Sequence, residues 1–407
     1  MREMKDSRIV WIGAIPKRWQ LSKIGSLYTQ RNEKVSDKDY QPLSVTMQGI
    51  LPQLATAAKT DDGDNRKLVR VGDFAINSRS DRRGSCGISP LDGSVSLINI
   101  ILTPRTAMHP GYYNWLFHTT LFADEFYKWG HGIVADLWTT RWQEMKSITV
   151  PVPEYAEQER IAAFLDAECA EINAVLEKTR ASIEEYKKLK QAVIMQAVTK
   201  GVRGDRPMKN SGIEWIGEIS QDFEIVKLKW LCDILDQFRS PVTADKRNQN
   251  ADVLYDYYGA SGAIDKIDSY TIDDHVMLIG EDGANLRMRN LPIMYEINGK
   301  AWINNHAHIL RPKEGVDFHF VFYALEALDL NYYITGSAQP KLSQDNLRNI
   351  WIPITDFSEQ KRIAAYISDV CVGLDRLIAK KQQHLTEIEN YKKSLIYEYV
   401  TGKKEVV

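Results

Sequence analysis

Cysteine is scarce in this chain of 407 residues, and none of its four cysteines forms a CxxC pair with another. Zinc binding and a redox dithiol are therefore poor interpretations, and a reducing, cytoplasmic environment fits. No stretch of 18 consecutive apolar residues occurs, which argues against a membrane-spanning helix. Residues 1–13 also lack the apolar segment of a secretory signal.

Sequence signatures of several catalytic classes are missing as well. The chain contains no GxxxxGK[ST] loop for ATP, no GxGxxG dinucleotide motif and no N/D-P-P-Y/F tetrapeptide of an adenine methyltransferase. The acids around Asp356 and Glu359 resemble a nuclease triad only superficially, because they are closely spaced at the predicted start of a helix. We therefore expect a chain that is not an enzyme by itself.

What the chain does contain is an internal repeat. The motif EQ-x-RIAA occurs at residues 157–163 and again at 359–365, an offset of 202. The motif WIG at residues 11–13 returns at 215–217, an offset of 204. A period this long, present twice, indicates two tandem copies of a unit of about 200 residues with pseudo-two-fold symmetry. Duplex DNA, which is itself close to two-fold, suits such a molecule.

Each copy ends in a segment with the three-four alternation of apolar residues that is typical of a coiled coil. We predict long helices over residues 156–200 and 358–407, and Gly373 is the single Gly or Pro within their periodic parts. Pro153 and Ser358 mark the starts, and Gly201 and Gly402 follow the ends. Two helices of matching length and register are expected to pack on each other as an antiparallel pair. Cys169 and Cys371, 202 residues apart, are expected to be buried in them.

The segments before the helices, residues 1–155 and 201–357, are predicted to be globular domains of mixed α/β structure. The fold class is thus α+β. The spans predicted to be strands are 68–77, 94–103, 148–153, 276–279, 301–310 and 350–355, and those predicted to be helices are 112–129 and 318–330. The two domains share this order but diverge strongly between the landmarks, as two readers of different sequences would.

The duplicated order WIG, domain, proline-containing strand, EQ-x-RIAA and long helix resembles the specificity subunit of a type I restriction–modification enzyme. The resemblance covers nearly the whole chain; Ser220 and Phe223 of the second copy replace Pro16 and Trp19 of the first. It implies that residues 1–155 and 201–357 are target recognition domains, each reading one half of a bipartite site in double-stranded DNA. The helix pair would set the distance between the two halves.

The resemblance also implies partners. Two methyltransferase (M) subunits would dock on the scaffold, and restriction or translocase (R) subunits would join them. S-adenosylmethionine, ATP and Mg²⁺ would belong to these partner subunits, and we expect no cofactor in this chain. If the helices act as a ruler, inserting four residues after Thr199 should lengthen the undefined spacer, because one helical turn is about 5.4 Å.

Direct readout of DNA needs Arg or Lys for guanine and Asn or Gln for adenine, usually on loops. In the first domain, residues 77–84 place three arginines among small residues, and a shorter cluster follows at 139–141. The candidates there are Asn77, Arg79, Arg82, Arg83 and Arg141. Each arginine could instead be a solvated charge or part of an internal ion pair.

In the second domain, candidate readers lie in the segment GEDGANLRMRN and in two later loops. They are Arg287, Arg289, Asn290, Asn304, Asn305, Gln339 and Lys341. His306 and His308 alternate in a strand-like run without a nearby cysteine, so we interpret them as structural or polar-contact residues and not as metal ligands.

The two domains differ in net charge. The whole chain carries −2, but residues 1–156 hold 20 Lys and Arg against 16 Asp and Glu, a net +4. Residues 201–358 hold 16 against 23, a net −7. Phosphate attraction in the second domain would therefore depend on a local basic patch.

Two other interpretations stay open. The chain could be the recognition subunit of another DNA modification or phage-defence system, with the same DNA chemistry and different partners. The acidic second domain instead favours a coiled-coil scaffold that holds two protein-binding domains.

Overall fold

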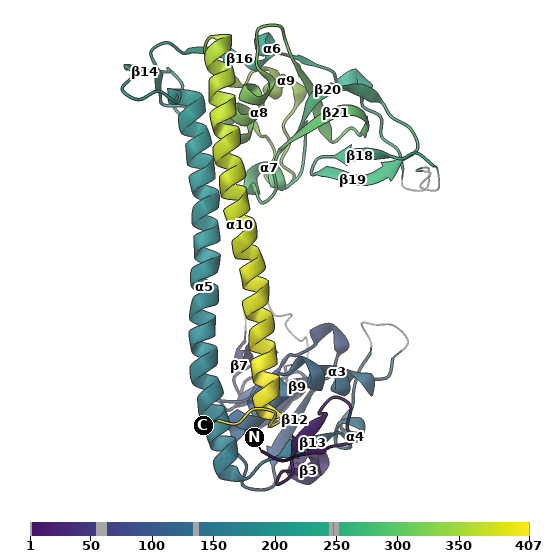
Figure 1. Ribbon diagram of the computed structural model, residues 1–407. Helices are drawn as coiled ribbons and strands as arrows, with labels where there is room; N and C mark the ends of the chain where they lie inside the picture. The colour runs from purple at the N-terminus through teal and green to yellow at the C-terminus, as the bar shows by residue number, and fades with distance from the viewer. Residues whose placement is uncertain (1, 54–62, 133–137, 244–246, 248–251, 407) are drawn as a thin grey trace. The chain divides into compact units, whose positions relative to one another are not determined.

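The chain divides into two compact units in the computed structural model, which describes residues 2–53, 63–132, 138–243, 247 and 252–406. Unit 1 comprises Met1–Arg180 and Gln383–Val407, and unit 2 comprises Ala181–Gln382. Each unit combines one globular domain with a stretch of both long helices (Figure 1). The mixed α and β composition agrees with the predicted fold class.

The two long helices are α5 (Tyr155–Lys200) and α10 (Phe357–Val400), of 46 and 44 residues. Their starts lie within one residue of the predicted positions, and α10 ends at Val400, before the predicted end of its segment. A glycine with positive φ follows each helix: Gly201 at 76° directly follows α5, and Gly402 at 71° follows α10 after Thr401. Glycine adopts this left-handed conformation without a Cβ clash, so it terminates helices readily.

Within each unit the two helices pack antiparallel, as predicted. In unit 1 the rings of Phe164 and Tyr399 lie 4.4 Å apart, and Lys392 donates to Asn173 at 2.7 Å. Contacts in unit 2 follow the same direction: Lys190 pairs with Asp375 at 2.7 Å, and Lys381 lies over the Tyr186 ring. Cys169 and Cys371 are buried, as expected.

The glutamate of the repeated EQ motif is buried and ion-paired in both copies. Glu157 accepts hydrogen bonds from Trp19 Nε1 at 2.8 Å and from Arg2 at 2.9 Å. Glu359 accepts one from Arg206 at 2.6 Å. A buried carboxylate without such partners would be costly, so these bonds fix the start of each long helix against the segment that opens its own copy.

The glutamine of the same motif joins two backbone groups, again in both copies. Gln158 accepts from the backbone N–H of His109 at 2.9 Å, and Gln360 accepts from that of Asp317 at 2.8 Å. Each glutamine also donates to the carbonyl oxygen five residues before it, at 2.8 and 2.7 Å. The repeated motif is therefore a structural clamp between helix and globular domain.

The described part of unit 1 is built from short strands and helices. The strands are β1 (Met4–Asp6), β2 (Ala14–Pro16), β3 (Gln20–Lys23), β4 (Tyr28–Arg31), β5 (Lys34–Val35), β6 (Leu43–Thr46), β7 (Gly49–Pro52), β8 (Arg66–Val69), β9 (Phe74–Asn77), β10 (Cys86–Ile88), β11 (Gly93–Val95), β12 (Asn99–Pro104) and β13 (Thr149–Val152). The short helices are α1 (Ile24–Leu27), η1 (Ser80–Arg82), α2 (Pro110–Phe117), α3 (Thr120–Lys128) and α4 (Trp142–Met145). The larger sheet has the order β10-β9-β12-β4, a smaller one is β11-β8-β5, and β13 pairs with β3.

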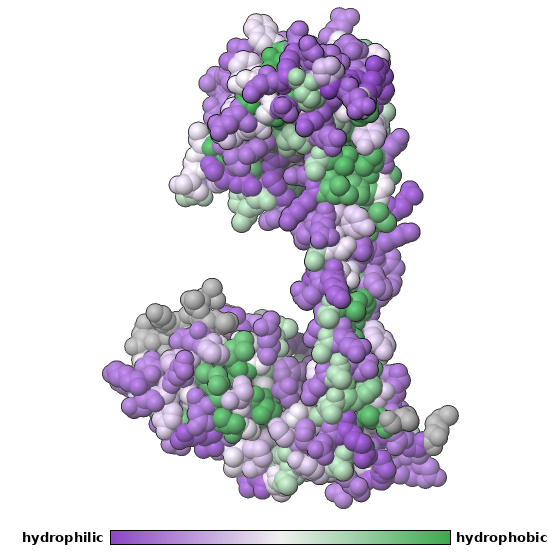
Figure 2. All heavy atoms as spheres, turned by 90° about the vertical axis from the view of Figure 1, so that its left-hand side faces the viewer, coloured by the Kyte–Doolittle hydropathy of each residue, from purple (hydrophilic) through white to green (hydrophobic). Residues whose placement is uncertain are grey.

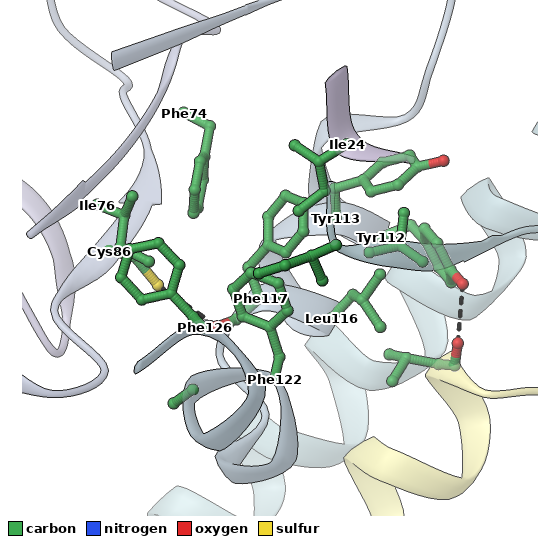
Figure 3. Close-up of a cluster of buried hydrophobic side chains, with 14 of the residues drawn as sticks. Ile24, Phe74, Ile76, Cys86, Tyr112, Tyr113, Leu116, Phe117, Phe122 and Phe126 are labelled. Carbon is green, nitrogen blue, oxygen red and sulfur yellow. Dashed lines mark hydrogen bonds between the residues drawn. The ribbon is translucent and has the colours of Figure 1, made fainter. Parts of the chain in front are cut away.

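An aromatic core packs the helices α2 and α3 against the larger sheet of unit 1 (Figure 3). The ring of Phe117 lies 4.5 Å from that of Phe74 on β9 and 4.7 Å from that of Phe122 on α3. Tilted aromatic pairs of this kind contribute about 0.5–1.5 kcal/mol each beyond the burial of their area. Tyr112 completes the core and donates to the carbonyl oxygen of Val400 at 2.8 Å, which ties α2 to the end of α10.

The described part of unit 2 is also built from strands and short helices. The strands are β14 (Met208–Asn210), β15 (Glu218–Ser220), β16 (Glu224–Lys227), β17 (Cys232–Ile234), β18 (Tyr255–Gly259), β19 (Gly262–Ile267), β20 (Ile272–Gly280), β21 (Met294–Ile303), β22 (Ala307–Pro312) and β23 (Trp351–Ile354). They include two longer strands, β20 and β21, of 9 and 10 residues. The short helices are α6 (Leu228–Leu231), η3 (Asp236–Phe238), α7 (Asn285–Met288), α8 (Phe318–Ala327), η5 (Asn331–Tyr333) and α9 (Gln344–Arg348). The sheet order is β17-β22-β20-β21-β18-β19, and β16 pairs with β23.

The two domains share a common framework. β4-β12-β9 in unit 1 and β17-β22-β20 in unit 2 have the same order, and β3–β13 corresponds to β16–β23. β22 pairs with β20 so that His308 lies opposite Ile279, just as Ile100 on β12 lies opposite Ile76 on β9. This register shows which positions of the two domains are equivalent.

Several predicted elements are broken by turns. The span 68–77 holds two strands, β8 and β9, separated by a turn at Gly72, whose φ is 86°. The span 94–103 covers the end of β11 and most of β12, and the span 301–310 covers the end of β21, a turn and part of β22. The predicted helix 112–129 is two helices, because Thr119 caps α3 by accepting from the Phe122 N–H.

Candidate nucleic-acid interface

Three loops of unit 2 that carry predicted DNA-binding residues lie against one another. They are the loop after β20, the turn between β21 and β22, and the segment 335–342 before α9. Glu281 N donates to His306 O at 2.8 Å, Gly283 N to Pro340 O at 3.0 Å, and Leu342 N to Glu281 O at 2.7 Å. Residues far apart in the sequence therefore form one continuous surface, which we call the unit 2 loop cluster.

Five predicted residues are exposed on these loops. They are Arg287, Asn290, Asn305, Gln339 and Lys341. Arg287 also donates to the carbonyl oxygen of Ile334 at 3.1 Å, and Lys341 pairs with Glu281 at 3.1 Å. These two cations hold the loops together while part of each side chain remains open to solvent.

Two predicted residues have internal roles instead. Arg289 donates to the carbonyl oxygens of Glu326 and Leu328 at 2.7 and 2.9 Å, and burial lowers its pKa. Asn304 is 5% exposed, and its side chain accepts from the backbone N–H of His306 at 2.8 Å. Arg289 therefore stabilises the end of α8, Asn304 shapes the β21–β22 turn, and we leave both out of the proposed DNA surface.

Charged groups beneath the loop cluster form a compact network that the sequence did not indicate. Arg239, just after η3, pairs with Glu281 and lies 3.2 Å from Asp236. Burial alone would raise the pKa of Asp236, but hydrogen bonds from His308 and Gln344 outweigh it and leave that pKa lowered. Burial likewise opposes a lowered pKa at Glu281, where Arg239 and Lys341 prevail. The carboxylates of this network are thus held in their charged form.

In unit 1 the two predicted clusters also meet. Thr140 N donates to Ser78 O at 3.0 Å, and Ser80 N donates to Trp138 O at 3.0 Å. Asn77 is 7% exposed, and its side chain accepts from the backbone N–H of Arg79 at 3.0 Å. Asn77 therefore shapes the turn that presents the arginines, and Arg79 follows it on the surface of the loop.

The arginines of the two unit 1 clusters differ in their exposure and in their ion-pair partners. The Arg82 side chain is 69% exposed, and its nearest acid, Asp81, is 3.7 Å away. Arg83 pairs with Asp124 and lies 5.8 Å from the centroid of the Tyr127 ring. Arg141 is exposed directly before α4. Arg82 is thus the candidate in this loop best placed to meet an external phosphate or base.

A shallow hollow of about 430 Å³ adjoins the unit 1 loop, and sequence reasoning missed most of its lining. The lining residues are Ser80, Arg83, Asp124, Tyr127, Lys128 and Trp138. Trp138 donates its indole N–H to Tyr127 O at 2.8 Å, which fixes the ring beside Arg83. The sequence signal for Trp138 was its position directly before the cluster 139–141.

In the part of the chain that the structure describes, no group of three or more His, Cys, Asp and Glu side chains is arranged to hold a metal ion. None of the helices in that part is long and apolar enough to cross a membrane.

The fold therefore defines a class of protein, in which two like domains with unlike loop surfaces are joined to a pair of long helices. Residues 220–390 match the type I restriction modification DNA specificity domain family. The resemblance expected from the repeat is thus confirmed by the similarity of residues 220–390 to that domain.

Two curated relatives carry the same description. The putative type I restriction enzyme specificity subunit S.HindORF215P of Haemophilus influenzae is 28% identical over 159 residues, which are 39% of this chain and 37% of the relative. The type I restriction enzyme MjaVIII specificity subunit of Methanocaldococcus jannaschii is 27% identical over 282 residues, 64% of this chain and 63% of the relative. The chain thus spans less than two thirds of the length of either relative.

Similarity of fold extends further than similarity of sequence. A solved chain from a structure of the type I R-M system, described as the basis of complex assembly and conformational transition, matches with a TM-score of 0.72. The match covers 96% of this chain and 99% of the other at 14% sequence identity. At this identity the likeness establishes the fold.

Proposed function

We propose that this chain is the DNA sequence-recognition subunit of a type I restriction–modification complex. Each globular domain would read one half of a bipartite site in double-stranded DNA. The observation that carries the proposal is a shared strand framework with unlike loop surfaces, in a chain whose residues 220–390 match the DNA specificity family. A shared scaffold with different loops is what two different half-sites require.

Exposed apolar residues on the long helices support the docking of two copies of one partner, the M subunit. Val175 and Leu377 are 47% and 44% exposed, and Leu189 and Tyr391 are 47% and 54% exposed. Each pair is separated by the repeat offset of 202, so the same outward positions are apolar in both copies. Hydrophobic patches are visible along the helices in Figure 2. Apolar residues repeated in this way favour two equivalent protein contacts.

The chemistry would belong to the partners. M subunits would bind S-adenosylmethionine and methylate adenine, and R subunits would use ATP and Mg²⁺. The buried, ion-paired acids at the starts of α5 and α10 support a non-catalytic role, since both EQ motifs serve as clamps. Cytoplasmic location and the spacing role of the helices remain part of this proposal.

The decisive experiment is modified-base sequencing of DNA from a methylation-free host that expresses this chain with its M subunit. We expect N6-methyladenine in a split motif, with two short defined halves around a gap of fixed length. A continuous motif would point to a different modification system. Absence of methylation from a complex that forms would favour the protein scaffold.

A salt titration separates DNA binding from protein binding independently. DNA affinity should fall steeply with salt, with a slope of about 0.9 for each phosphate neutralised. A binding constant that does not change with salt would contradict the proposal.

A further inference from the structure

His308 lies on β22 in the interior of unit 2, with 1% of its surface exposed. Its Nδ1 is 2.6 Å from an Asp236 carboxylate oxygen, and its Nε2 is 2.8 Å from the carbonyl oxygen of Leu342. A backbone carbonyl can only accept. Nε2 therefore donates the hydrogen bond to Leu342.

The surroundings of Asp236 favour its ionised form. Gln344 donates to its Oδ2 at 2.8 Å, and the Ile309 N–H donates to its Oδ1 at 3.1 Å. Arg239 adds a guanidinium nitrogen at 3.2 Å. These donors, together with His308, keep the pKa of Asp236 low despite burial. Both ring nitrogens of His308 are thus bonded to partners inside unit 2, one to the Asp236 carboxylate and one to the Leu342 carbonyl oxygen.

The framework itself does not need a histidine here. The equivalent position on β12 of unit 1 is Ile100, which is 4% exposed and lies opposite Ile76 as His308 lies opposite Ile279. An apolar side chain therefore fills the same place in the other domain. Because burying a polar ring costs free energy that its hydrogen bonds must offset, its presence in one domain alone indicates a function specific to that domain.

The bonds of His308 lead to the unit 2 loop cluster. Leu342 ends the segment that carries Gln339 and Lys341, and its N–H is bonded to Glu281. On the other side, Asp236 contacts Arg239, whose guanidinium pairs with Glu281. His308 thereby links the segment 335–342 to η3 by direct hydrogen bonds. Through Leu342 and Arg239 it is also linked to Glu281 in the loop after β20.

We infer that His308 is a positioning residue that sets the conformation of the segment 335–342 and so determines which bases the second domain accepts. The inference rests on the proposed function of that domain as a DNA reader. His308 would not touch DNA itself. It would act through the placement of Gln339 and Lys341, which are exposed at the surface of the segment.

The variant His308→Ile tests the inference, because isoleucine occupies the equivalent position in unit 1. With the M subunit in a methylation-free host, we expect base discrimination to fall on the order of ten-fold at the second half-site. The first half-site should be unchanged. A matched control is Ile279→Ala, which alters the neighbouring buried position on β20 and removes no side-chain hydrogen bond.

The outcomes separate the inference from the proposed function. If the wild type methylates no split motif, the proposed function fails before His308 is tested. If the wild type reads a split motif and His308→Ile reads the same one, the inference is overturned. Equal relaxation in Ile279→Ala would also overturn it, since general loosening of the core would then explain the effect.

A second measurement does not depend on the folding of any variant. In the full chain with ¹⁵N-labelled histidine, long-range ¹H–¹⁵N correlations report the protonation of each ring nitrogen. We expect a proton on the Nε2 of His308, which donates to the Leu342 carbonyl oxygen, and this signal should be absent from His308→Ile. A His308 ring without a proton on Nε2 would overturn the inference.

Discussion

At the scale of single residues, the exposed arginines differ from the buried ones in what they can contact. Arg82 projects into solvent, whereas Arg289 has both of its guanidinium partners within unit 2. Composition alone cannot distinguish the two, because each lies in a short polar loop with other arginines nearby. The distinction depends on the carbonyl oxygens that end α8, which lie about 40 positions away in the sequence.

Replacing Arg82 and Arg83 with alanine should change base preference at one half-site only, because both lie on the unit 1 loop. Loss of the phosphate contacts should also reduce the salt slope of DNA binding by about one for each contact removed. Methylation mapping and salt titration of the complex measure the two effects. Arg70→Ala, which removes an exposed arginine paired with Asp92, is the matched control. Equal loss at both half-sites would show that these arginines are not readers.

Replacing Arg289 with methionine should destabilise unit 2 by about 2–4 kcal/mol. The change leaves two carbonyl oxygens unpaired and removes a cation that favours the charged form of the Glu326 carboxylate. Urea denaturation followed by circular dichroism gives the free energy of unfolding. Arg287→Met, at an exposed position two residues earlier, should cost less than about 1 kcal/mol. Similar losses in both variants would contradict the structural role of Arg289.

At the scale of elements, the starts of the long helices depend on side chains that reach into the globular domains. The repeated EQ motif was visible in the sequence, but its role was not, since its partners are backbone groups of distant loops. Gln158 bonds to His109, 49 residues away, and Gln360 bonds to Asp317, 43 residues away. The motif occurs twice because the same contacts connect each long helix to its globular domain.

Gln158→Ala should lower the stability of unit 1 by about 1–3 kcal/mol, because a buried backbone N–H and a carbonyl oxygen lose their partner. Thermal unfolding monitored by circular dichroism measures the loss. Gln360→Ala should have the same effect on unit 2. Gln143→Ala, at an exposed position on α4, is the control and should change stability by less than about 0.5 kcal/mol. No loss in either clamp variant would contradict the joint.

Strand boundaries were predicted less well than helix boundaries, because the strands are much shorter than the two long helices. Helical periodicity persists over more than 40 residues in α5 and α10, so a local error has little effect. The strands are short, and a turn such as the one at Gly72 divides what looks like one apolar run. In the span 301–310, the apolar residues on both sides of the β21–β22 turn hid the change of direction.

At the scale of the whole molecule, the proposed function assigns the spacing of the half-sites to the helix pair. The sequence suggested inserting residues after Thr199. Val198 and Thr199 are buried in unit 2, however, at 0% and 3% exposure. An insertion there would disturb a core, so it cannot test spacing alone. Many side chains in the middle of both helices are exposed, so an insertion there does not disturb the core of either domain.

Matched insertions of seven residues should lengthen the undefined spacer and leave both half-sites unchanged. One heptad enters α5 between Lys178 and Thr179, and the other enters α10 between Glu389 and Asn390. Two turns keep the apolar seam in register and add about 10 Å, or roughly three base-pair steps. Methylation mapping measures the spacer. An insertion in α5 alone is the control and should destabilise the pair, because the seam is then out of register. An unchanged spacer in the matched variant would contradict the hypothesis that helix length sets the distance between the half-sites.

The sequence by itself determined the features that depend on local patterns. The tandem repeat, the two long helices, their glycine stops and the order of elements in each domain follow from spacing along the chain, because helix periodicity and stop signals act over a few residues. Only the tertiary structure decided which loops form one surface, why Arg289 faces inward and which partners His308 bonds to. Those outcomes arise from hydrogen bonds between residues far apart in the chain, such as His308 with Asp236 and Leu342. Local sequence patterns do not specify such long-range contacts.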